Sequence, residues 1–148
     1  MGENRVITTL SELGPAKGKI RLNSYGSLAW RPDETQLAIA TFAEHSVRVV
    51  DGRSGHQTAS MGVGGGWLYA FTSVSWEPGG RRLVSSGGNR YAWIWELSDP
   101  NPIVTLRGHS SAVTSVAWCP TADIVATGSS DSTVRLWDVQ SAETIAVL

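Results

Sequence analysis

The sequence contains one cysteine and no long apolar run, and both shortages exclude classes of protein. Cys119 alone cannot form an internal disulfide or a site of several thiolates, so the chain is no disulfide-rich secreted scaffold. It fits a reducing compartment, and we expect an intracellular location, cytoplasmic or nuclear. No apolar segment approaches the roughly 18 residues of a membrane-spanning helix, so we expect no membrane contact.

The sequence also lacks an excess of charge of either sign. Twelve basic residues, ten of them arginine, face 13 acidic ones, which leaves a net charge of −1. A near-neutral chain has no overall basic field that would attract nucleic acid. With 148 residues, of which 41% are hydrophobic, the chain has the size and composition of one globular domain or part of one.

Tryptophan, in contrast, is abundant and periodic. Trp76 and Trp118 are 42 positions apart, as are Trp95 and Trp137. Around them, residues 74–78 match residues 116–120, and an earlier, weaker copy has Trp30 in the place of Trp76. In this first copy, Val50 replaces the second tryptophan. Three copies therefore span residues 24–148, and the sequence is a repeat array.

Each copy reads as four short β-strands separated by turn residues. In the third copy the expected strands are Ala112–Trp118, Ile124–Gly128, Thr133–Asp138 and Thr144–Leu148. Ile124–Gly128 is apolar enough to be buried on both faces. Strands at about ten-residue spacing predict an all-β fold of four-stranded antiparallel sheets.

The third copy resembles a complete unit of the WD-repeat (Trp-Asp repeat) family, from Gly108 and His109 through to Trp137 and Asp138. In the second copy, Glu96 follows Trp95, Asn89 stands for Asp131, and Gly66 and Trp67 stand for Gly108 and His109. The resemblance implies blades of a β-propeller, arranged radially around a channel. We expect an N-terminal segment at 1–23, blade 1 at 24–61, a Gly-rich connection at 62–69, blade 2 at 70–106 and blade 3 at 107–148.

Three blades are fewer than the about four to eight that close a propeller. We therefore expect an incomplete ring, or one completed by an oligomer. The further blades would come from a longer chain, which we favour, or from a second copy of this one.

The resemblance also implies a structural tetrad of His109, Thr127, Asp131 and Trp137, joined by buried hydrogen bonds. The same groups could suggest a hydrolase triad. However, the sequence has no G-x-S-x-G motif, and the second copy keeps neither the His nor the Asp. We expect no catalytic residue.

The chain offers no other convincing chemical site. His45, His56 and His109 lie in different repeats without metal-ligand spacing, so we expect no metal. No motif indicates a cofactor. Arg81, Arg82 and Arg90 are interpreted as solvated turn residues.

The function that the resemblance implies is a non-catalytic scaffold that binds other proteins or peptides. The recognition residues would be those of the loops at one end of the blades, namely Trp67, Tyr69, Asn89, Arg90, Ser111 and Ser130. Trp67 either packs into its blade or forms an exposed anchor. Two alternatives are an RNA-binding propeller and the propeller part of a larger enzyme or regulatory protein.

Overall fold

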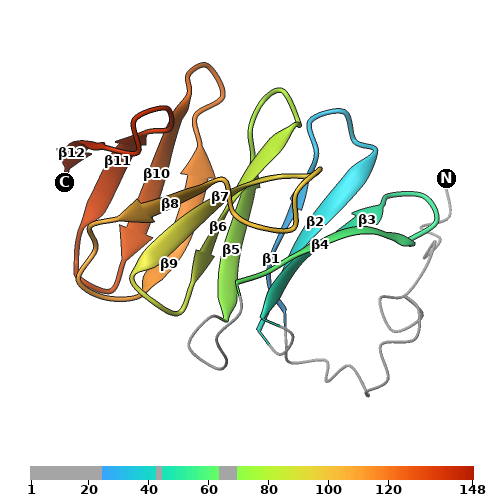
Figure 1. Ribbon diagram of the computed structural model, residues 1–148, viewed down its shortest axis with the longest axis horizontal. Coiled ribbons are helices and arrows are strands. Elements are labelled where there is room, and N and C mark those ends of the chain that lie inside the picture. Colours follow the sequence, from blue (N-terminus) through green and yellow to red (C-terminus); the bar gives the residue numbers. More distant parts are fainter. Residues whose placement is uncertain (1–24, 43–44, 64–69) are drawn as a thin grey trace, which may run out of the picture.

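The described part of the chain consists of three four-stranded antiparallel sheets (Figure 1). The computed structural model describes residues 25–42, 45–63 and 70–148. The first sheet contains β1 (Tyr25–Trp30), β2 (Gln36–Thr41), β3 (Ser46–Asp51) and β4 (Gln57–Met61). The second contains β5 (Phe71–Trp76), β6 (Arg82–Gly87), β7 (Tyr91–Glu96) and β8 (Val104–Arg107). The third contains β9 (Val113–Trp118), β10 (Ile124–Ser129), β11 (Val134–Asp138) and β12 (Thr144–Val147). The predicted all-β fold of four-stranded antiparallel sheets is confirmed.

Aspartates at the ends of two strands stabilise the turns that follow them. Asp51 ends β3, and its Oδ1 accepts a hydrogen bond of 2.7 Å from the N–H of Ser54. Asp138 ends β11 and accepts one of 2.8 Å from the N–H of Ser141. A short carboxylate side chain that binds the backbone two or three residues on is a typical turn former. The Asp of the repeat therefore fixes the turn to the last strand.

Each strand predicted for the third sheet differs from the observed strand by one residue at one of its ends. Ala112 lies before β9, and its carbonyl accepts a hydrogen bond from the N–H of Ser130 in a neighbouring loop. Thr133 lies before β11, because its N–H donates to the side chain of Asp131. β10 extends to Ser129, and β12 ends at Val147.

The sheets lie side by side, with the second between the other two (Figure 1). Burial follows from this order. In the second sheet, Leu83–Gly87 of β6 are all buried, because both faces are covered. In β10, only Val125 and Thr127 are buried, and the other four residues are half-buried. The expectation that Ile124–Gly128 is buried on both faces is wrong, because only one face of the third sheet has a described neighbour.

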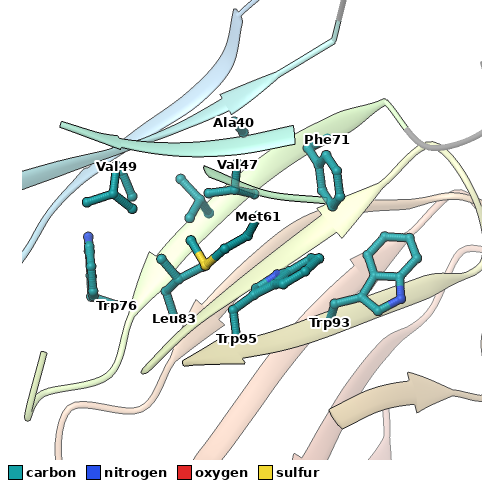
Figure 2. Packing of buried hydrophobic residues seen from close by; sticks show 11 residues of the cluster. Ala40, Val47, Val49, Met61, Phe71, Trp76, Leu83, Trp93 and Trp95 are labelled. Carbon is teal, nitrogen blue, oxygen red and sulfur yellow. The ribbon is translucent and has the colours of Figure 1, made fainter. Parts of the chain in front are cut away.

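Two apolar clusters hold the sheets together. Between the first and second sheets, Val47 and Val49 of β3 pack against Leu83 and Trp95, as Figure 2 shows. Between the second and third, Ile94 belongs to a cluster of ten buried residues that includes Val125 and Trp137. Apolar burial of this kind is the main force that would hold repeated sheets in contact.

The first strands of the three sheets are neighbours, since β5 contacts both β1 and β9. β1 and β5 approach each other closely at Gly26, where an added Cβ would lie 2.6 Å from the carbonyl oxygen of Thr72. A side chain at this position would overlap the next sheet, so glycine is required. Among the described residues, no helix is long and apolar enough to cross a membrane.

Candidate functional site

A chain of three hydrogen bonds runs through the third sheet. The indole Nε1–H of Trp137 donates to Oγ1 of Thr127 at 2.8 Å. Oγ1 of Thr127 lies 2.7 Å from Nε2 of His109, and Nδ1 of His109 lies 2.8 Å from Oδ2 of Asp131. An ionised carboxylate only accepts, so Nδ1 carries the proton, and in the neutral ring Nε2 accepts from the threonine hydroxyl. The structure thus brings together all four residues of the predicted tetrad.

The four residues come from separate elements, and Asp131 joins two of the loops. His109 lies between β8 and β9, whereas Asp131 lies in the turn between β10 and β11. Asp131 also accepts hydrogen bonds from the N–H of Ser110 and from both the N–H and the hydroxyl of Thr133. The hydroxyl of Thr133, above all, holds the pKa of Asp131 well below its usual range, assisted by the Ser110 N–H and by His109, whereas desolvation opposes this shift. The carboxylate therefore stays charged and fixes both loops.

Burial limits what this group of residues can do chemically. Thr127 is only 1% exposed, and its hydroxyl oxygen already forms hydrogen bonds with Trp137 and His109. A nucleophile must reach its substrate, which this hydroxyl does not. In the part of the chain that the structure describes, no three His, Cys, Asp or Glu side chains are grouped to hold a metal ion.

The second sheet keeps only part of this arrangement. Trp95 donates its indole N–H to Oγ of Ser85 at 2.8 Å, as Trp137 does to Thr127. Asn89, in the place of Asp131, accepts from the N–H of Tyr91 within its own turn. Phe71 packs edge-on against Trp95, with ring centres 5.9 Å apart. Trp67 and Tyr69, which we expected on the recognition surface, lie outside the described residues.

The first sheet replaces the hydrogen bond by an apolar contact, which the sequence analysis missed. Val50 holds the place of Trp137, and Ile39 holds the place of Thr127. Both are buried in one small cluster. Without an indole N–H, the site needs no hydroxyl acceptor, so exchanging both partners for apolar groups costs little. The loss of tryptophan at position 50 was the signal that could have identified Ile39.

Three loops meet at one end of the second and third sheets, and we call this surface the loop face. It comprises residues 88–90, 108–112 and 129–133. The carbonyl of Asn89 accepts a 2.8 Å hydrogen bond from the N–H of Val113, which links the second sheet to the third. Oγ of Ser129 donates to the carbonyl of Ser111 at 3.1 Å. Of the predicted recognition residues here, Arg90 and Ser130 are exposed, and Asn89 and Ser111 are half-buried.

Arg107, another cation at this end of the second sheet, was missed. It pairs with Tyr91 between β8 and β7, and its guanidinium carbon lies 4.6 Å from the centre of the tyrosine ring. Tyr91 follows Arg90 in the sequence, so both cations belong to this end of β7. Only the strand register could have placed Arg107 here, because 16 positions separate it from Tyr91.

Arg82 is not the solvated turn residue that we expected. It begins β6, donates to Oε2 of Glu77 and to Oδ1 of Asp123, and lies 5.0 Å from the centre of the Trp118 ring. Desolvation lowers the pKa of Arg82, but the hydrogen bonds and the charge attraction of Glu77 and Asp123 together outweigh it and raise the pKa. Arg81, whose side chain is 75% exposed, fits the expectation better, although it pairs with Glu96.

Known proteins share this repeat. The family model described as "WD domain, G-beta repeat" matches residues 54–96 and 100–138. Denticleless protein homolog of Gallus gallus is 42% identical over 89 residues, which are 59% of this chain and 11% of that protein. WD repeat-containing protein fzy-1 of Caenorhabditis elegans is 30% identical over 129 residues, or 77% of this chain and 25% of that protein. The chain therefore spans a quarter or less of these relatives' length.

The fold has solved counterparts as well. A structure described as "Crystal structure of RRP9 WD40 repeats" aligns with a TM-score of 0.76 at 21% sequence identity, and the alignment covers 84% of this chain and 38% of that one. At this sequence identity the similarity shows the fold alone, and it confirms that the sheets are propeller blades. Because the family model matches more than half of the sequence, the chain belongs to the WD domain, G-beta repeat family.

Proposed function

We propose that the chain is a non-catalytic scaffold that binds other proteins or peptides through the loop face. The observation that carries this proposal is the hydrogen-bonded connection of the three loops through Asn89, Val113 and Asp131. Loops that are already fixed lose little conformational freedom on binding, and such preorganisation favours affinity. The family membership supports the same function, since repeat folds offer extended rigid surfaces.

The proposed recognition residues on this face are Asn89, Arg90, Ser111 and Ser130. Trp67 and Tyr69, which lie outside the described residues, stay predictions from the sequence. Arg90 is the best anchor among them, because an exposed guanidinium has five donors and interfaces are enriched in arginine. Arg107, on Tyr91, adds a second exposed cation. We propose that the tetrad of His109, Thr127, Asp131 and Trp137 serves this surface by holding its loops in place.

The proposal is tested by immobilising the 148-residue chain and identifying the intracellular proteins that it retains. Arg90→Ala should reduce their recovery while circular dichroism stays unchanged. Arg53→Ala is the matched control, because Arg53 is an exposed arginine in the turn between β3 and β4, at the other end of the strands. Equal recovery with wild type and both variants would refute a binding role for the loop face.

A further inference from the structure

The acidic residues of the described chain gather at one end of the sheets, which we call the acidic end. Nine of the ten described aspartates and glutamates lie where a first strand turns into a second or a third into a fourth, in the turn or at the strand end beside it. The tenth, Asp131, lies on the loop face at the opposite end. Its side chain is only 7% exposed and binds His109, Ser110 and Thr133. The loop face therefore has no exposed aspartate or glutamate side chain.

The arginines at the two ends differ in their partners. Three of the four described arginines at the acidic end pair with carboxylates, namely Arg31 with Asp33, Arg81 with Glu96, and Arg82 with both Glu77 and Asp123. Arg90, in the loop face, and Arg107, next to it, are exposed, and neither has an acidic partner among the described residues. Their charges are therefore available to a ligand.

The register of β7 and β8 brings these two arginines to one edge of the loop face. Tyr91 pairs with Arg107 across the two strands, and Arg90 directly precedes Tyr91. The ring of Tyr91 supports the guanidinium of Arg107, whose carbon lies 4.6 Å from the ring centre. Stacking of this kind orients a guanidinium, and its planar fork of donors matches the oxygen pairs of a carboxylate or a phosphate. The edge thus presents two groups suited to oxyanions.

A third arginine adds its charge beneath the same loops. Gly108 follows Arg107, and a Cβ added to it would lie 2.9 Å from Nη1 of Arg135. The Nε of Arg135 is buried without a hydrogen-bond partner, and no described acidic side chain pairs with this arginine. Solvent screens a partly buried charge less than an exposed one, so Arg135 raises the positive potential of the loops above it. Three arginines thus oppose the single carboxylate of Asp131 at this end.

We propose that the segment bound by the loop face is an acidic peptide, whose carboxylate or phosphate oxygens bind the guanidinium groups of Arg90 and Arg107. This proposal rests on the binding role proposed above and adds the chemistry of the partner. The acidic end would repel the same segment, which favours its arrival at the loop face. RNA fits less well, because single-stranded nucleic acid is held by aromatic rings under its bases, and the loop face has no Phe, Tyr or Trp.

Retention of peptides by the immobilised 148-residue chain tests the proposal. Three pools of random peptides of equal length are offered: one with aspartate and glutamate, a second with asparagine and glutamine in their place, and a third that is the second pool with phosphoserine for serine. We expect retention of an acidic pool at least about tenfold above the second pool, and a decrease as NaCl rises from about 50 to 500 mM. Retention of the first pool indicates carboxylates, and retention of the third alone indicates phosphate.

Charge reversal identifies the residues that bind. Arg90→Glu and Arg107→Glu should each reduce retention of the acidic peptides by about tenfold or more, because a like charge would then face each oxyanion. Arg53→Glu is the matched control, since it reverses an exposed arginine at the acidic end, and its retention should equal that of wild type. Circular dichroism checks the fold of each variant, and Arg90→Ala replaces Arg90→Glu if the latter unfolds.

Four results would overturn the proposal. These are no retention of either acidic pool, equal retention of the acid-free pool, an Arg53→Glu variant as impaired as Arg90→Glu, and a single-stranded RNA of the same length that binds more tightly than the peptides. The scaffold role is separable from it. Intracellular proteins whose recovery depends on Arg90, found together with no preference for acidic peptides, would refute only the chemistry of the partner. Recovery that Arg90→Ala leaves unchanged would refute both.

Discussion

Nη2 of Arg82 lies 3.0 Å from Oδ1 of Asp123, which belongs to the next sheet. The same guanidinium pairs with Glu77 and covers the ring of Trp118. One side chain thus joins a turn of the second sheet to a turn and a strand of the third. Its partly buried position makes the charges interact more strongly than they would at the surface.

Replacing Arg82 by alanine should lower the free energy of unfolding by about 1–3 kcal/mol, because the buried side chain of Glu77 would lose its hydrogen-bond donor. Arg81→Ala is the matched control. Its pair with Glu96 is solvated, and exposed pairs contribute about 0–1 kcal/mol. Urea denaturation followed by tryptophan fluorescence measures both changes, and similar losses for the two variants would contradict the role of Arg82.

Gly26→Ala should lower the free energy of unfolding by about 1–3 kcal/mol, the usual cost of overpacking, because the new methyl group would meet the backbone of Thr72. Gly128→Ala is the control. Its Cβ would have no neighbour nearer than 3.8 Å, at the Cβ of Ser115. Thermal melts compare the two substitutions. A Gly26→Ala variant as stable as Gly128→Ala would show that β1 and β5 can move apart at no cost.

Asp131→Ala should destabilise the chain more than Asn89→Ala. The first substitution removes the carboxylate that accepts from the buried Nδ1–H of His109, from Ser110 and from Thr133, and the loss of a buried hydrogen-bond partner costs about 1–3 kcal/mol. Asn89 accepts from a single N–H in its own turn. Chemical denaturation measures the free energy of unfolding of both variants. Equal losses would contradict the conclusion that the tetrad of the third sheet stabilises the chain more than Asn89 does.

Stability should depend on Asp131 in acid. Its pKa is lowered in the folded chain, so its contribution is complete above the unfolded value of about 4 and is lost as the pH falls below that. The melting temperature of wild type minus that of Asp131→Asn should therefore shrink from pH 5 to pH 3. A constant or growing difference would exclude the proposed ionisation.

The strands were predictable because each repeat marks the same places with tryptophan, proline and turn residues. The resemblance to the WD-repeat family identified the four tetrad residues, since the third copy retains the complete pattern. What spacing could not show is the contact between repeats. Arg82 was taken for a turn residue because Asp123, 41 positions away, belongs to another sheet.

Burial was the other property that the pattern did not reveal. Trp30, Trp76 and Trp118 look equivalent in the sequence, but only the last two are buried. The difference depends on whether a preceding sheet lies against each strand. A repeat therefore predicts the structure of a sheet, whereas the exposure of its faces depends on its place in the array.

The position of the second sheet between its two neighbours also determines how the described array should open. Either end sheet can detach by exposing a single interface, whereas the second cannot unfold without exposing two. In nearest-neighbour systems, partial opening begins at the ends and the interior opens last. Backbone amides of β6 and β7 should accordingly exchange with deuterium slowest, and only when the whole array unfolds.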